Sequence, residues 1–270
     1  MKKKMSLVLA ILIGFSVSGC ATNFENSADS QLGYVNTANL GDTGSPVNPI
    51  KAQALRETAT SLGAQGALAW RAKAINSTLT NEASSLDKLY DFNRLMLPNN
   101  VLPPVLAESS NALTQSDADT LRLADKTYKI LSPARFTTTP PTWRTYLWLS
   151  FKQPDIPDKT LLPKTQPEAK IWNNYLKVGW EKGLTQANQI FSANMSRLKR
   201  DYLGIVLYRK LYAQHMVSAP FVARAELGVT GNKNEVRIND QVLKITSHSA
   251  LQTNSAKWKP VLQNTQDSNA

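Results

Sequence analysis

Two long stretches with apolar residues at helical spacing constrain the fold most. The first begins at Asn48 and Pro49, since Asn can accept hydrogen bonds from the free N–H groups of a first turn and Pro fits that turn. It runs to about Leu95. The second begins at residues 166–168 and runs to about Val217. Because both carry an apolar stripe, we expect two long amphipathic helices that pack on each other. The apolar positions are Leu55, Leu62, Trp70, Leu79, Leu86 and Phe92 in the first, and Ile171, Tyr175, Val178, Leu184, Phe191, Met195, Leu198, Tyr202 and Ile205 in the second.

Glycines lie inside the first of these helices, and prolines lie at or beyond the ends of both. Gly63 and Gly66 lie inside the first, where each glycine costs about 1 kcal/mol relative to alanine. They therefore predict either a close helix contact or a break. Prolines at 98, 103 and 104 end the first helix, and Pro220 lies beyond the second.

Two stretches with period-two alternation predict β-structure. Residues 120–130 (TLRLADKTYKI) align without gaps on residues 235–245 (EVRINDQVLKI). If the central Asp and the residue after it form the turn, each stretch would be a short antiparallel β-hairpin. The sequence thus predicts an α+β fold, with two long helices and short hairpins.

This hairpin register would place two cations opposite each other. Arg122 would face Lys129, and Arg237 would face Lys244, which is unfavourable for isolated pairs. Either acidic groups in the fold or on a partner neutralise both basic faces, or the charges face water. We keep both interpretations, and the first makes these four residues candidates for a partner interface.

Residues 136–148 (FTTTPPTWRTYLW) are dense in aromatic side chains. Pro140 and Pro141 predict an extended backbone just before Trp143. Trp143, Tyr146 and Trp148 suit core packing. Aromatic side chains with a polar edge also anchor protein interfaces, so these three are candidate interface residues as well.

The N-terminus has the three parts of a secretory signal peptide over residues 1–19. A basic start at residues 2–4 precedes an apolar run from Leu7 to Val17, which is too short for the roughly 20 residues of a membrane span. Residues 17–20 (VSGC) then fit a bacterial lipobox, and Cys20 is the only cysteine. The alternative is an ordinary signal peptide with a chance cysteine.

Lipidation of Cys20 would anchor the chain through a diacylglyceryl group and an N-acyl chain. Each buried methylene contributes about 0.8 kcal/mol, so several chains anchor stably. Because Ala21, and not Asp, follows the cysteine, we expect sorting to the outer membrane, facing the periplasm. Residues 20–47 are polar and predict a flexible tether, although residues 41–45 could form an ordered turn. We expect one folded domain over residues 48–250 and a disordered tail over residues 251–270.

The composition limits which ligands and activities we expect of the chain. Without the three lysines of residues 2–4, 28 basic and 20 acidic side chains remain, a formal charge of +8 that suits anionic lipid or an acidic partner. The basic clusters are short, so we expect no direct nucleic-acid binding. His215 and His248 are the only histidines, and no nucleotide-binding or hydrolase motif is present. We therefore expect no metal, no cofactor besides the acyl groups and no enzymatic activity, with His215 at a helix end.

Eight segments spread over the mature chain resemble one family. The chain resembles DotC, the lipoprotein of Dot/Icm (type IVB) secretion systems, together with its conjugative-plasmid relative, the TraI lipoprotein. Its C-terminus is shorter than in Legionella-type members, so the conjugative branch is the nearer resemblance. The matching segments are residues 41–45, 63–73, 90–93, 102–106, 137–148, 161–165, 207–211 and 227–231.

The resemblance implies a subunit of an outer-membrane core complex. Such a subunit would work with the small lipoprotein DotD to place a DotH-type component at the outer membrane, in a multi-copy ring that supports transfer of protein or plasmid DNA. It implies no catalytic residues. The competing hypothesis is a lipid-anchored periplasmic binding protein or envelope hydrolase with a ligand site between the long helices.

Overall fold

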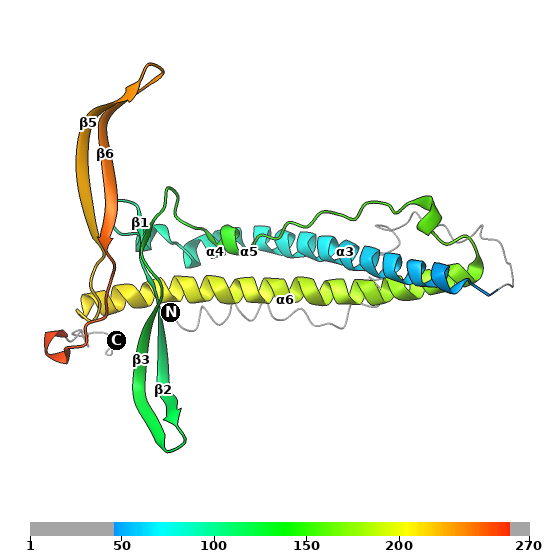
Figure 1. Ribbon diagram of the computed structural model, residues 1–270, viewed down its shortest axis with the longest axis horizontal. Coiled ribbons are helices and arrows are strands. Elements are labelled where there is room, and N and C mark those ends of the chain that lie inside the picture. The colour runs from blue at the N-terminus through cyan, green and yellow to red at the C-terminus, as the bar shows by residue number, and fades with distance from the viewer. Residues whose placement is uncertain (1–45, 260–270) are drawn as a thin grey trace, which may run out of the picture. The chain divides into compact units, whose positions relative to one another are not determined.

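The computed structural model describes residues 46–259 and shows an α+β fold of long helices and antiparallel strand pairs (Figure 1). The predicted signal peptide, Cys20 and nearly all of the predicted tether lie outside the described residues. The chain divides into two compact units, where one domain was predicted. The helical unit comprises residues up to Thr80 with Leu149–Phe191, and the hairpin unit comprises Asn81–Trp148 with the residues from Ser192 onward.

Helix α3 (Pro49–Asn81) begins where the sequence predicted. The side chain of Asn48 accepts a hydrogen bond from the N–H of Ile50 at 2.9 Å, and its carbonyl accepts one from Ala52 at 2.8 Å. The helix ends 14 residues before Leu95, the predicted end. A turn at Glu82 separates it from α4 (Ala83–Leu89), and a short 3₁₀ helix, η3 (Asn93–Leu95), follows.

Helix α6 (Gln166–Ala213) is the second predicted helix and contributes to both units. Thr165 precedes it and accepts a hydrogen bond from the N–H of Glu168 through its hydroxyl. The helix ends four residues before the predicted Val217. His215, with φ of 58°, turns the chain into the left-handed region there, so the prediction of His215 at a helix end is confirmed.

In the helical unit, α3 and the first part of α6 run parallel and side by side (Figure 1). Glycines bring the two backbones together, because a Cβ at Gly63 would overlap the backbone of Leu176, and a Cβ at Gly179 would overlap that of Thr60. Gly63 therefore marks a close helix contact and not a break. The buried core beside this contact consists of Leu55, Ala59, Leu62, Ala67, Trp172 and Trp180.

In the hairpin unit, the core gathers around the last part of α6. Tyr208 and Leu211 are buried with Leu106 and Val217. Gly204 lies against Val105 and Leu106, where any side chain would collide with β2 (Val105–Asp117). Leu106, Tyr128 and Ile130 pack in this core near the base of the first hairpin, and a β-bridge between Val217 and Leu251 flanks the second.

Two long hairpins leave this core, each a two-stranded antiparallel sheet (Figure 1). Strand β2 pairs with β3 (Thr120–Ser132), and β5 (Phe221–Asn232) pairs with β6 (Glu235–Ser247). A third, minimal pair joins β1 (Val101–Leu102) to β4 (Arg135–Phe136). The two hairpins therefore do not share one sheet.

Part of the predicted disordered tail is ordered. Leu251 forms a β-bridge with Val217, and the indole N–H of Trp258 donates to the carbonyl of Gln252 at 2.9 Å. A 3₁₀ helix, η5 (Ser255–Lys257), lies between them. The prediction of disorder was wrong for residues 251–259, because backbone hydrogen bonds to Met216 and Gln214 fix this polar segment. Residues 260–270 lie outside the description.

None of the helices between residues 46 and 259 combines the length and apolar composition that a membrane-spanning helix needs.

Candidate partner interface

The aromatic segment forms α5 (Trp143–Leu147), a short helix whose aromatic side chains point into the hairpin unit. Trp143 is 1 % exposed and Tyr146 is 9 % exposed. Neither can be an anchor on the free surface, so the interface prediction is wrong for these two, and the core alternative holds. Of the three predicted aromatic interface residues, only Trp148, at 49 % exposure, presents its ring to solvent.

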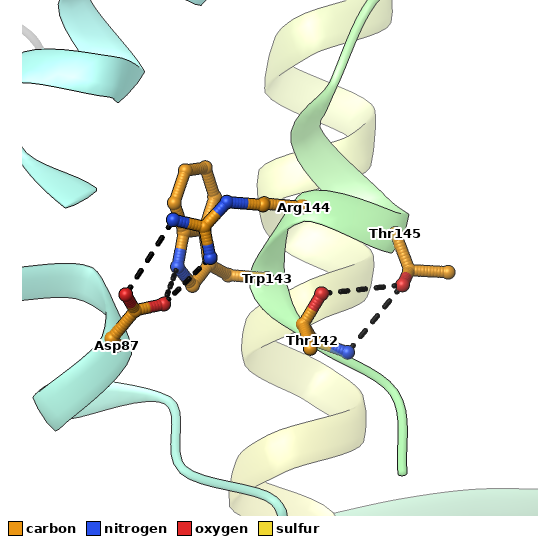
Figure 2. Close-up of polar contacts among 5 residues, drawn as sticks. All are labelled: Asp87, Thr142, Trp143, Arg144 and Thr145. Carbon is orange, nitrogen blue, oxygen red and sulfur yellow. Dashed lines mark hydrogen bonds and ion pairs between the residues drawn. The ribbon is translucent and has the colours of Figure 1, made fainter. Parts of the chain in front are cut away.

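A carboxylate on α4 holds α5 in place. Figure 2 shows Asp87 directed at both Trp143 and Arg144. Its Oδ1 accepts hydrogen bonds from the indole Nε1 at 2.6 Å and from Arg144 NH1 at 2.8 Å, and the guanidinium lies 4.3 Å from the Trp143 ring centre. The bond from Arg144, followed by that from Trp143, lowers the pKa of Asp87.

Threonines define where α5 begins. Thr142 is extended, as its preceding prolines predicted, and its N–H donates to the hydroxyl of Thr145 at 3.4 Å (Figure 2). The Thr145 N–H donates in turn to the Thr142 carbonyl at 3.0 Å. This reciprocal cap fixes the entry of the chain into the helix, and hence the direction of Trp143.

Tyr146 links α5 to α6. Its hydroxyl donates to Asp201 at 3.2 Å, and the Arg197 guanidinium lies 5.2 Å from its ring centre. The Phe92 ring stacks on the Tyr146 ring, with ring centres 5.9 Å apart. Burial, followed by the Asp201 charge and hydrogen bond, raises the pKa of Tyr146 to about 12, so the phenol stays neutral.

Asp87→Ala should lower the free energy of unfolding at pH 7, because it leaves the buried indole N–H of Trp143 without its acceptor and removes the charge opposite Arg144. The folded state lowers the pKa of Asp87. Its stabilisation is therefore fully present above the ordinary carboxyl pKa of about 3.9 and is lost as the pH falls through the folded value. Urea denaturation of the parent chain and of the Asp87→Ala variant at pH 7 and pH 3 measures this difference in the free energy of unfolding.

Asp155→Ala is the matched control. Asp155 pairs with Lys152 at 2.8 Å, and both side chains are exposed. Exposed pairs contribute little, so this variant should unfold like the parent chain at both pH values. Equal behaviour of the two variants would refute the structural role assigned to Asp87.

The predicted first hairpin turn is absent. Residues 120–130 form one continuous strand within β3, whose partner β2 lies earlier in the chain. Arg122 therefore opposes Thr114, and Lys129 opposes Ala107, so the predicted Arg122–Lys129 clash does not occur. The alternating pattern was read correctly as β-structure, but the same alternation suits one long strand as well as two short ones.

The second copy of the pattern behaves in the same way. Residues 235–245 form one strand within β6. Arg237 opposes Thr230, Lys244 opposes Ala223, and Arg237 pairs with Glu235 at 2.9 Å. The four predicted basic residues thus lie on two separate hairpins, each facing a neutral residue across its own ribbon.

The ends of both hairpins carry exposed apolar side chains. The predicted register did not place these side chains at the end of a hairpin. The first tip cluster is Leu113, Leu121 and Leu123, and the second tip cluster is Val229, Val236 and Ile238. Their side chains are 58–69 % and 65–75 % exposed, respectively. A signal was present in the sequence, since the stretch from 121 to 130 holds no Gly or Asn-Gly to form a two-residue turn.

The competing hypothesis places a ligand site between the long helices, and it stays a prediction. A depression of about 420 Å³ lies beside α3 and α6 and is lined by exposed and half-buried side chains. Across residues 46–259, no three His, Cys, Asp or Glu side chains group as a metal site. The lining residues are Arg56, Glu57, Thr60, Ser61 and Tyr175.

A protein-family model matches residues 49–260, nearly all of the described chain. Its description is a TraI family of the type IV secretory system, for conjugal DNA-protein transfer. The chain therefore belongs to this family and is a type IV secretion-associated protein. Curated proteins give no match.

Proposed function

We propose that this protein is an outer-membrane lipoprotein subunit of a type IVB secretion or conjugation core complex. Acyl chains on Cys20 would anchor it on the periplasmic side, and with a DotD-like lipoprotein it would recruit and retain a DotH-type component there. Several copies would assemble in a ring. The role is structural, without catalysis, cofactor or direct nucleic-acid contact.

The family match over residues 49–260 carries the proposal, because it links nearly the whole described chain to conjugal DNA-protein transfer. The lipobox at residues 17–20 supports the anchor. Two long hairpins, each with apolar side chains in solvent, support protein partners, because a two-stranded ribbon gains little stability alone in water.

Purification of the full chain from native outer membranes tests this proposal. We expect the DotH-type and DotD-like proteins to co-purify, and crosslinking followed by mass spectrometry should join them to this chain. Recovery of the chain from the outer membrane without either protein would reject the recruitment role. Recovery from the soluble fraction would reject the lipid anchor, and recovery from the inner-membrane fraction would reject the outer-membrane location.

A further inference from the structure

The two hairpins repeat one another at their ends. Leu113 opposes Leu123 across the first ribbon, and Val229 opposes Ile238 across the second. Leu121 and Val236 lie two residues further along the same faces, because alternate residues of a strand share a face. On the reverse faces, Thr114 opposes Arg122 and Thr230 opposes Arg237. The internal repeat thus places equivalent apolar trios on equivalent ribbons.

The turns beside these trios also correspond, but their charges differ. Asp117 and Asn232 each accept a hydrogen bond from the N–H two residues on, at 2.9 Å, which closes a two-residue turn. Residues 117–122 carry two Asp and one Arg, a formal charge of −1. Residues 232–237 carry one Lys, one Glu and one Arg, a formal charge of +1. The ends of the two hairpins are therefore oppositely charged.

This charge pattern indicates which surface contacts the tip clusters. A membrane surface is unsuitable for the first hairpin, because Asp117 and Asp119 at its turn would enter the interface first. Two first hairpins would bring four aspartates together, whereas a first and a second hairpin bring Asp117 and Asp119 beside Lys233. Like charges across an interface disfavour the wrong pairing.

We propose that the first tip cluster of one copy packs face to face on the second tip cluster of the next copy, with both turns at the same end. Each copy would then use two different surfaces for two neighbours. Such a heterologous contact repeats from copy to copy and closes into a ring when the rotation allows it. The inference rests on the proposed function only for its multi-copy assembly and does not need the lipid anchor.

Cysteine crosslinking in cells that carry the secretion system tests this contact in the full chain. Leu123→Cys and Ile238→Cys in one chain should give a ladder of dimers, trimers and higher multiples on non-reducing gels. When two chains are produced together, each with one of these substitutions, they should give the mixed dimer. Cys20 is the only other cysteine, so the parent chain provides the background.

Thr114→Cys with Arg237→Cys is the matched control. These positions lie on the reverse faces of the same ribbons and should give no ladder. A dimer from Leu123→Cys alone would overturn the pairing. So would a disulfide within one monomer of the double variant, or the absence of any mixed dimer although the DotH-type partner stays in the outer membrane.

Charge reversal gives a second measurement. Asp117→Lys with Asp119→Lys should remove the ladder of the Leu123→Cys, Ile238→Cys chain, and adding Lys233→Asp should restore part of it. A ladder that persists while the DotH-type partner becomes soluble would refute the recruitment role alone. A ladder unaffected by the reversed charges would overturn the charge-selected contact.

Discussion

A Cys20→Ser variant is expected to move the DotH-type partner from the outer-membrane fraction to the soluble fraction and to abolish transfer. The physical reason is that the partner would be held at the membrane only by binding this chain, which acyl chains on Cys20 would anchor. At about 0.8 kcal/mol for each buried methylene, these chains would dominate the free energy of membrane attachment. Membrane fractionation with immunoblotting, together with a transfer assay, measures both effects.

Ala21→Asp is the matched control for this experiment. It keeps Cys20, the predicted site of acylation, but introduces the residue whose absence favours outer-membrane sorting in bacterial lipoproteins. The partner should then appear in the inner-membrane fraction, which separates the loss of lipid from the loss of location. If the partner stayed in the outer membrane with a folded Cys20→Ser chain, the recruitment model would be wrong.

Gly179→Ala should lower the free energy of unfolding by about 3 kcal/mol, the upper end of the usual cost of overpacking. The added Cβ would overlap the backbone carbonyl of Thr60, and a backbone cannot rotate aside as a side chain can. Helices α3 and α6 would have to separate locally, which loosens the packing of Trp180. Urea denaturation followed by tryptophan fluorescence measures the change.

The sign of this effect is diagnostic. In an exposed helix the same substitution stabilises by about 1 kcal/mol, because alanine has the higher helix propensity. Gln186→Ala, on the exposed side of α6, is the control and should change the stability little. A gain in stability for Gly179→Ala would show that the two backbones do not meet at this position.

Sequence reasoning located the helices because their signals are local. Asn48 caps its own helix, and the apolar spacing of α6 is readable without any partner. The end of α3 was missed, since helix formers continue past Asn81 although the chain turns at Glu82. Gly63 was correctly flagged, but its neighbour on α6 could not be named from the sequence.

The hairpins show where local reasoning fails. Alternation identifies a strand but does not reveal its partner, and the partner of β3 lies in residues 105–117, a largely polar stretch with three Ser. The predicted turn at Asp125 lies in the middle of strand β3. The predicted clash between Arg122 and Lys129 is therefore absent from the fold. The predicted turns also gave no indication of the exposed tip clusters.

By itself, the sequence determined the α+β class, the two long helices, the internal repeat and, through residues 17–20, the predicted site of lipidation, because each depends on the order and spacing of neighbouring residues. Only the tertiary structure decided that Trp143 and Tyr146 are buried while Trp148 is exposed. Only it decided that Arg122 and Arg237 each oppose a threonine. Burial and strand register depend on which distant segments pack together, and composition and spacing along the chain do not contain that information.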